Sequence, residues 1–302
     1  MLNKIIVPLD GSALAERIVP FAGSLATALN LPLELLYAVD PEALRVTREQ
    51  EEQGIFVDKL EQRVEGWARA YLHGVADSLN QPGVRPRIAV TVAVPERAIV
   101  DAAGRGGRDL VAMATHGRTG LSRLVLGSVA DRVLHLGHMP LLLLRPRQEK
   151  APPPQPPKTL IVPLDFPEAE HALPMAGFLA RNLGARVLLV RVLHPFALAV
   201  PQPVLVGTSR GREQPGQGEA EVRAYLDEQV HSLYAERIAA DGIVVGGDPG
   251  EEIMKLAASQ REALVVMATH ARGGIARMLL GSVVERVVGG LGTPVLALRP
   301  RS

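Results

Sequence analysis

Residues Met113 to Ser128 read MATHGRTGLSRLVLGS, and residues Met267 to Ser282 read MATHARGGIARMLLGS. In each copy a short apolar run, which predicts a buried strand, ends at a Thr-His pair. A glycine-bearing loop then leads to Gly-Ser and a helical pattern. A helix start offers free backbone N–H groups and the positive end of the helix dipole, which together favour an anion. The stretch therefore predicts a phosphate-binding loop that occurs twice.

The Gly-Ser pairs also admit an interpretation without a ligand. Ser128 with Asp131, and Ser282 with Glu285, match the S-x-x-[DE] capping box, in which side chains satisfy the first turn of a helix. Capping does not require the run at 114–117 to lie at a fixed distance from the Gly-Ser pair. That loop favours the phosphate interpretation.

The sequence around this stretch is duplicated. LIVPLD at Leu160–Asp165 corresponds to IIVPLD at Ile5–Asp10. His116 and His270 differ by 154 positions, as do the two Gly-Ser pairs, and ten of sixteen residues are identical between 114–129 and 268–283. We therefore predict a tandem duplication of one domain.

The two copies are separated by a proline-rich segment. Five prolines fall between Pro152 and Pro157, a composition typical of a stiff, solvated spacer. We predict a first domain at residues 1–147, a linker at 148–157 and a second domain at 158–302. The Pro/Gly-rich stretch from Pro195 to Gly218 is predicted to be a mobile loop.

Apolar runs and helical patterns alternate along each copy. In the first half the predicted strands are 2–9, 33–39, 87–94, 110–113 and 140–145, and the predicted helices are 13–30, 57–79, 96–103 and 129–136. This alternation, with strands that are almost continuously apolar, predicts an α/β fold with a parallel sheet covered on both faces.

Composition excludes several classes of function. The 302 residues carry a net charge of +1 and only 3% aromatic residues, which argues against nucleic acid as a partner. The absence of cysteine excludes disulfides, thiolate metal sites and cysteine nucleophiles, and fits an intracellular protein. No apolar stretch is long enough for a membrane helix, and the N-terminus does not resemble a signal peptide.

Candidate binding residues fall at the ends of predicted strands, where ligands bind in an open parallel sheet. Asp10 follows the first strand and offers a carboxylate to ribose hydroxyls, unless it only caps the next helix. Ala38 and Val39 end the second strand and offer backbone groups and apolar contact to a base. The residues after the fourth strand that would hold phosphates are Ala114, Gly117, Gly127 and Ser128. Together these groups predict a nucleotide site.

These residues resemble the universal stress protein family, whose pattern is G-x2-G-x9-G-[ST] after the fourth strand with an aspartate after the first. The first half carries Ala114-Thr-His-Gly117, nine residues and Gly127-Ser128. The second half carries Ala268-Thr-His-Ala271, nine residues and Gly281-Ser282, with Asp165 after its first strand. The resemblance covers essentially both halves.

The resemblance implies a fold. Each half would be a Rossmann-like, adenine nucleotide alpha hydrolase-like three-layer α/β domain, with a five-stranded parallel sheet in the order 3-2-1-4-5. The fifth strands, at Pro140–Arg145 and Pro294–Arg299, would pair and join the halves as an intramolecular pseudo-dimer. A homodimer of the whole chain is a further expectation.

The resemblance also implies a function. Members of the ATP-binding branch hold ATP in this crevice, while others bind no nucleotide. We predict a cytoplasmic, ATP-binding stress-response protein that changes shape or partners with nucleotide, with Mg²⁺ accompanying the phosphates and without membrane or nucleic-acid partners. No catalytic or metal-ligating residue is predicted. The candidate nucleotide-binding residues are Pro8, Leu9, Asp10, Ala38, Val39, Met113, Ala114, His116, Gly117, Gly127, Ser128, Val129, Asp165, Val192, Ala268, His270, Gly281 and Ser282.

Two alanines depart from the family pattern. Ala114 replaces the first glycine, and its methyl group fits if the backbone φ stays negative. Ala271 replaces the second glycine, where a Cβ would interfere with a positive φ or with a close phosphate. We therefore expect the first half to bind ATP more tightly than the second.

Two other functions remain as alternatives. One is a scaffold of the same fold that binds no nucleotide, which the two alanines favour. The other is slow ATP hydrolysis, for which Arg118 and Arg123 are candidates near the phosphates. No Walker A pattern is present, and His135-Leu-Gly-His138 matches the HxGH signature of nucleotidyltransferases but precedes the fifth strand, away from the ligand edge. We interpret that match as chance and expect both histidines to be solvated.

Overall fold

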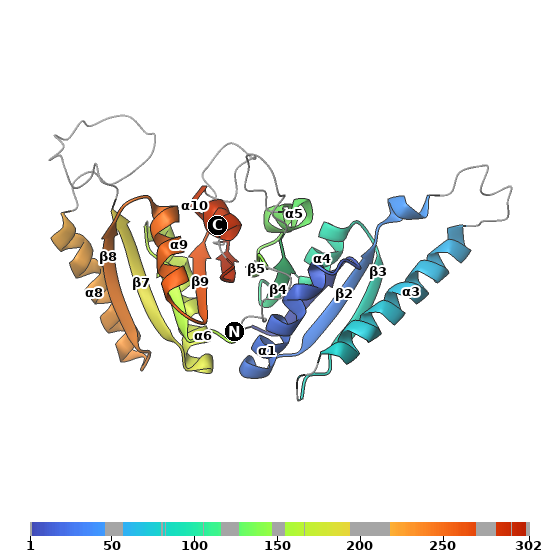
Figure 1. The fold of residues 1–302 in the computed structure, drawn as a ribbon, viewed down its shortest axis with the longest axis horizontal. Helices are drawn as coiled ribbons and strands as arrows, with labels where there is room; N and C mark the ends of the chain where they lie inside the picture. The colour runs from blue at the N-terminus through green and yellow to red at the C-terminus, as the bar shows by residue number, and fades with distance from the viewer. Residues whose placement is uncertain are drawn as a thin grey trace.

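In the computed structural model, the ten strands found among the described residues form one continuous sheet (Figure 1). The structure describes residues 2–45, 57–79, 81, 83–104, 106–115, 127–146, 155–165, 167–193, 218–269, 282–290 and 292–299. The strand order is β3-β2-β1-β4-β5-β10-β9-β6-β7-β8. The strands are β1 (Lys4–Leu9), β2 (Leu33–Val39), β3 (Arg87–Val92), β4 (Asp109–Ala114), β5 (Leu141–Leu144), β6 (Thr159–Pro163), β7 (Arg186–Leu193), β8 (Ala240–Gly246), β9 (Ala263–Ala268) and β10 (Val295–Leu298).

Helices cover both faces of this sheet. On one face α1 (Val19–Leu29), α3 (Val57–Ser78), α6 (Leu173–Leu183) and α8 (Glu219–Ala235) pack on a first apolar core. On the other face α4 (Pro95–Ala103), α5 (Ser128–Leu136), α9 (Pro249–Ser259) and α10 (Ser282–Gly290) pack on a second core. Three short 3-10 helices, η1 (Ala15–Ile18), η2 (Pro41–Leu44) and η3 (Pro167–Ala172), follow strands. The predicted α/β class with a mainly parallel sheet is confirmed.

The apolar runs form strands because helices cover both faces of the sheet, so the side chains on both faces of a strand are buried. In β1, Ile5 and Val7 enter the first core, while Ile6, which points to the opposite face, enters the second. Pro20 lies in the first turn of α1, where its missing N–H costs nothing. The predicted helix over 13–30 is therefore divided into η1 and α1.

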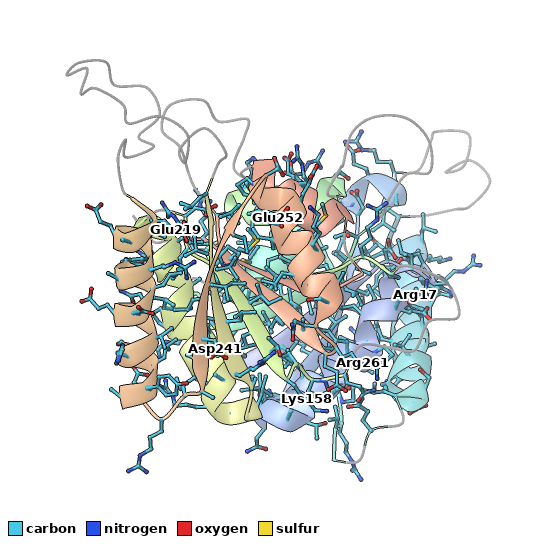
Figure 2. The ribbon with its side chains drawn as sticks, turned by 60° about the vertical axis from the view of Figure 1, so that its left-hand side comes forward. Arg17, Lys158, Glu219, Asp241, Glu252 and Arg261 are labelled. Atoms are coloured by element: carbon cyan, nitrogen blue, oxygen red, sulfur yellow. The ribbon has the colours of Figure 1, made fainter. Side chains whose placement is uncertain are left out.

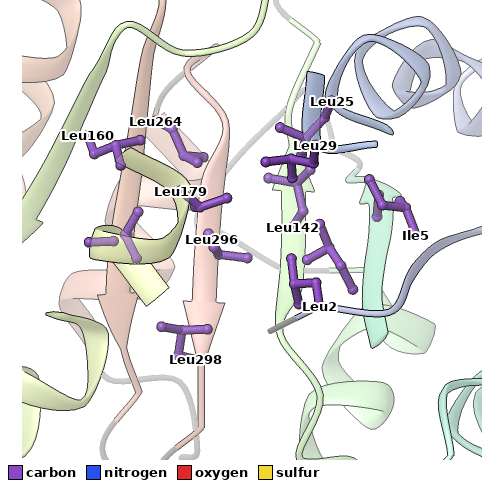
Figure 3. Close-up of a cluster of buried hydrophobic side chains, with 14 of the residues drawn as sticks. Leu2, Ile5, Leu25, Leu29, Leu142, Leu160, Leu179, Leu264, Leu296 and Leu298 are labelled. Atoms are coloured by element: carbon purple, nitrogen blue, oxygen red, sulfur yellow. The ribbon is translucent and has the colours of Figure 1, made fainter. Parts of the chain in front are cut away.

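The two halves of the sheet meet where β5 pairs antiparallel with β10; every other strand pair in the described sheet is parallel. Leu142 lies opposite Leu296 at this junction, and both side chains are buried. The first core runs through the junction without interruption, with leucines from both halves on the same side (Figure 3). Arg299 also donates to the carbonyl of His135 at 2.7 Å. The halves are therefore joined by sheet hydrogen bonds and by a shared core.

Two segments rich in proline or glycine, which were predicted to be a linker and a loop, lie mostly outside the described residues. Of the linker predicted at 148–157, the structure describes only 155–157, which carry neither helix nor strand. Of the predicted loop from Pro195 to Gly218 it describes only Gly218, the N-cap of α8. The domain boundaries stay predictions.

Two carboxylates near the junction, those of Asp131 and Glu285, are close enough to interact electrostatically. Glu285 lies 154 positions after Asp131, so the two are equivalent in the duplication. Burial raises the pKa of Glu285 above its ordinary value of 4.5, and the negative charge of Asp131 raises that pKa further. A carboxyl group with a raised pKa in the folded state stabilises the fold when protonated, and this contribution is lost as the pH rises through that pKa.

We therefore predict that Glu285→Gln stabilises the protein at neutral pH but not in acid. The difference from the native chain in the urea midpoint should be near zero at about pH 4 and positive at about pH 7. Glu221→Gln on the exposed side of α8 is the matched control and should leave both midpoints unchanged. A gain that is equal at the two pH values would contradict the explanation by charge.

Candidate functional site

The candidate site lies at the edge of the sheet where β2, β1 and β4 end. These strands are neighbours and parallel, with β1 in the middle, so their carboxyl ends lie side by side (Figure 1). The chain leaves β1 toward β2 and β3 in one direction, while β4 and β5 lie in the other. Such a reversal of strand order opens a crevice between the connecting loops, where open α/β sheets bind ligands.

Asp10 lies directly after β1 at the centre of this edge. Its carboxylate is exposed, and Oδ1 accepts a hydrogen bond from the backbone N–H of Ser12 at 2.9 Å. Ser12 Oγ in turn accepts from the N–H of Ala15, the first residue of η1, at 3.1 Å. The side chain of Asp10 therefore forms an Asx-turn with Ser12. Asp10 is not the N-cap of the following helix. Its second carboxylate oxygen is available to a ligand.

The end of β4 accommodates Ala114, the residue that replaces the first glycine of the family pattern. Met113 and Ala114 are partly exposed at this edge. Ala114 does not have a positive φ, since among the described non-glycine residues only Asn30, Arg237 and Glu262 do. The methyl group of Ala114 is therefore accommodated without backbone strain. His116 and Gly117 lie outside the described residues.

The start of α5 differs from the capping-box alternative. Gly127 is the N-cap, Ser128 is the first helical residue, and no side chain within the described residues caps the helix. The side chain of Ser128 is exposed, while Val129 is partly buried. Because no side chain in the described part of the chain caps this turn, its first N–H groups could meet an anion.

Not every candidate residue offers its side chain to the edge. The side chains of Leu9 and Val39 are buried in the protein, so only their backbone faces the crevice. The carbonyl of Val39 already accepts from the N–H of Ala93 at 3.0 Å. Pro8 lies one residue inside β1, in register with Leu36. The described candidates of the first half that remain at least partly accessible are Pro8, Asp10, Ala38, Met113, Ala114, Gly127, Ser128 and Val129.

The equivalent edge of the second half is more buried. Val192, Met267 and Ala268 are buried, whereas Ala38, Met113 and Ala114 are partly exposed, and Asp165 is partly buried whereas Asp10 is exposed. Ser282 begins α10, and His270 and Gly281 lie outside the described residues. The duplicated edges therefore share a backbone plan but differ in access.

Sequence analysis missed an aromatic cluster beside Asp10. The ring of Tyr37 from β2 meets Trp67 of α3 edge-on at 5.6 Å and Tyr71 at 6.1 Å, and Trp67 stacks on Tyr71 at 5.5 Å. The turn after Asp10 lies against this cluster, because a Cβ at Gly11 would come within 3.1 Å of Trp67. Gly11 also has a φ of +83°, which other residues rarely adopt. Trp67 is 52% exposed, so it lines the approach to Asp10.

One hydrogen bond of this cluster recurs in the second half. Tyr71 donates to Glu16 Oε1 at 2.9 Å, and Tyr225 donates to Glu170 Oε1 at 2.6 Å. Burial and this hydrogen bond to a carboxylate raise the pKa of both tyrosines, so both hydroxyls keep their protons. Both pairs differ by 154 positions, a signal that the sequence alone contains.

The two histidines of the HxGH match lie apart from the crevice, His135 in the last turn of α5 and His138 between α5 and β5. His138 is exposed, as expected, but the expectation that His135 is solvated is wrong. His135 is partly buried because its Nδ1 lies 2.6 Å from the carbonyl of Asp131, one turn back on its own helix. Both histidines therefore lie at the C-terminal end of α5 or just after it, and not at the candidate site.

Charged side chains are spread over the outer surface of the molecule, as Glu219 and Asp241 illustrate in Figure 2. None of the helices in the described part of the chain has the length and apolar character needed to cross a membrane.

The fold defines a class: α/β proteins in which helices cover both faces of a mainly parallel sheet whose strand order reverses beside β1. The model of the Universal stress protein family matches residues 1–145 and again 157–299. The chain belongs to the universal stress protein family, and it carries two copies of the family's sequence.

Individual relatives agree. Universal stress protein Rv2623 of Mycobacterium tuberculosis is 28% identical over 98% of this chain and 96% of its own length. Universal stress protein MJ0531 of Methanocaldococcus jannaschii is 29% identical over 49% of this chain and 86% of its own length. The crystal structure of a universal stress protein from Archaeoglobus fulgidus superposes with a TM-score of 0.67 at 19% identity, covering 98% of this chain and 96% of that one.

Proposed function

We propose that the first half of the chain binds adenine nucleotide, with ATP as the ligand, in the crevice beyond β2, β1 and β4. The observation that carries this proposal is the exposed carboxylate of Asp10 at the switch point of the strand order. A carboxylate there accepts hydrogen bonds from both hydroxyls of a ribose. The base would lie toward Ala38 at the end of β2.

The start of α5 supports the other end of the nucleotide. A helix capped by glycine, with an exposed serine in its first turn, offers N–H groups, a hydroxyl and a positive dipole to phosphate oxygens. The partly exposed end of β4 leads into the loop between these groups. Mg²⁺ would accompany the phosphates as part of the ligand.

Membership of the family supports the biological role. The Asp10 and Gly127-Ser128 positions match the ATP-binding branch of the family, so we propose a cytoplasmic stress-response protein whose shape or partners depend on nucleotide. Its domains, 1–147 and 158–302, would act as an intramolecular pseudo-dimer through β5 and β10. Labelled ATP is expected to be turned over slowly at most.

The only tryptophan of the chain gives a direct test. Because Trp67 is half exposed and contacts the turn that carries Asp10, ATP binding in the first half should change its fluorescence in a saturable way. Inorganic triphosphate, which lacks base and ribose, should change the signal only at much higher concentration. Calorimetry of the full chain with Mg-ATP measures the same binding independently. If millimolar Mg-ATP produces neither a fluorescence change nor heat, the proposed function is wrong.

A further inference from the structure

Position 37 of the first half and position 191 of the second are equivalent, but they hold different side chains. Tyr37 lies on β2 in register with Leu9, and 154 positions later β7 carries Arg191. A tyrosine and an arginine fill similar space, but only the arginine brings a positive charge and hydrogen-bond donors. The duplication therefore differs in charge beside its two upstream aspartates.

Arg191 turns back toward the end of the strand before it. Its Nη1 donates to the carbonyl of Leu164 at 2.7 Å, and Leu164 immediately precedes Asp165. The positive charge of Arg191 lowers the pKa of Asp165, although burial raises that pKa by more. The guanidinium is therefore close enough to act electrostatically on the carboxylate, and it comes from the strand position that Tyr37 holds in the first half.

Asp165 is correspondingly withdrawn from solvent. The residue is partly buried, and its carboxylate accepts a hydrogen bond from the N–H of Val192. Its Oδ1 is buried and has no hydrogen-bond partner among the described residues. Asp10, in contrast, is exposed and satisfied by its own turn.

The loop that follows β6 also differs from the equivalent loop that follows β1. The offset between the halves falls from 155 at Asp165 to 154 at Glu170, so the second loop is one residue shorter. The end of the fourth strand agrees, because Met267 and Ala268 are buried where Met113 and Ala114 are partly exposed. The ends of β6, β7 and β9 in the second half are thus each more buried than the ends of β1, β2 and β4 in the first.

We propose that Arg191 closes the second crevice by occupying the space in front of Asp165, so that the chain offers one nucleotide site, in its first half. Position 37/191 is then the residue that decides whether the upstream carboxylate is open to a ribose. This inference rests on the proposed function for its ligand, but the closure itself is a property of the free protein.

Chemical labelling tests the closure without any ligand. The full chain is treated with a water-soluble carbodiimide and glycine ethyl ester, and the modified aspartates are located by peptide mass spectrometry. In the native chain we expect Asp10 to be modified and Asp165 to be protected. In Arg191→Tyr, Asp165 should become modified, since the guanidinium no longer covers it. Arg223→Tyr, which removes an arginine paired only with Glu219 of its own helix among the described contacts, should leave Asp165 protected.

The reciprocal variant guards against loss of folding in Arg191→Tyr. Tyr37→Arg is expected to protect Asp10 from the reagent and to abolish ATP binding by the first half, while circular dichroism confirms that the chain is folded. Modification of Asp165 in the native chain at the rate of Asp10 would overturn the proposal. Continued protection of Asp165 in a folded Arg191→Tyr chain would overturn it as well.

Counting bound nucleotides separates this inference from the function on which it rests. Native mass spectrometry with excess Mg-ATP should find one nucleotide per chain, and two would overturn the closure. Because Ala271 would also weaken a second site, a count of one does not by itself identify Arg191, and the labelling identifies it. If no nucleotide binds, the proposed function fails, while the labelling still decides whether Arg191 covers Asp165.

Discussion

Asp10→Ala is expected to weaken ATP binding by about 10- to 100-fold, since a hydrogen bond to a charged group contributes roughly 1.5–3 kcal/mol. The substitution removes the carboxylate that would hold the ribose and leaves the start of α5 unchanged. Isothermal titration of the full chain with Mg-ATP measures the affinity. The same variant also loses the acceptor for the N–H of Ser12, so its thermal midpoint is measured alongside.

Asp101→Ala is the matched control for this experiment. Asp101 is an exposed aspartate on α4, away from the carboxyl ends of β1, β2 and β4. Its loss should leave the affinity for ATP unchanged. Equal affinities for the native chain and Asp10→Ala would remove Asp10 from the site and with it the main support for the nucleotide interpretation.

Leu142→Asp is expected to destabilise the whole chain by about 3–5 kcal/mol, the cost of an uncompensated charge in an apolar interior. Leu142 is fully buried at the junction, opposite Leu296. Denaturant unfolding is followed by circular dichroism, which reports on both halves, and by Trp67 fluorescence, which reports on the first. Because the core is continuous through the junction, both signals should shift together.

The same substitution at an exposed leucine provides the control. Leu136 ends α5 with 53% of its surface exposed, and Leu136→Asp should change stability by less than about 0.5 kcal/mol. If the two variants unfold at the same denaturant concentration, the junction contributes little to stability. If circular dichroism and fluorescence separate in Leu142→Asp, the halves unfold independently.

The helices and strands were largely predictable from apolar periodicity. The strand predicted at 33–39 is confirmed without change, because β2 is almost entirely apolar and its one charged residue, Glu34, pairs with Lys4 of β1. The strand predicted at 87–94 ends at Val92 instead. Pro95 starts α4 and makes Val94 its N-cap, so the last two residues leave the sheet.

The details of the site were less predictable, because they depend on side chains that come from distant strands. The sequence places an aspartate after each first strand, but it does not show that Asp165 is covered and Asp10 is not. In our proposal that difference depends on Arg191, which is 26 positions from Asp165 in the sequence but hydrogen-bonds to Leu164, the residue before it, in the folded sheet. The serine of Gly-Ser was weighed as a cap, although the cap is the glycine before it. Sequence patterns do not locate the first residue of a helix to within one position.

The antiparallel pairing of β5 with β10 has a consequence for how the two crevices can change. In an assembly of two identical chains, any substitution appears twice, so both pockets gain or lose the ligand together. Here one polypeptide supplies both sides of the seam, and each side carries its own sequence. A chain built this way is free to keep one pocket for sensing and to use the other half as a permanent, ligand-independent support.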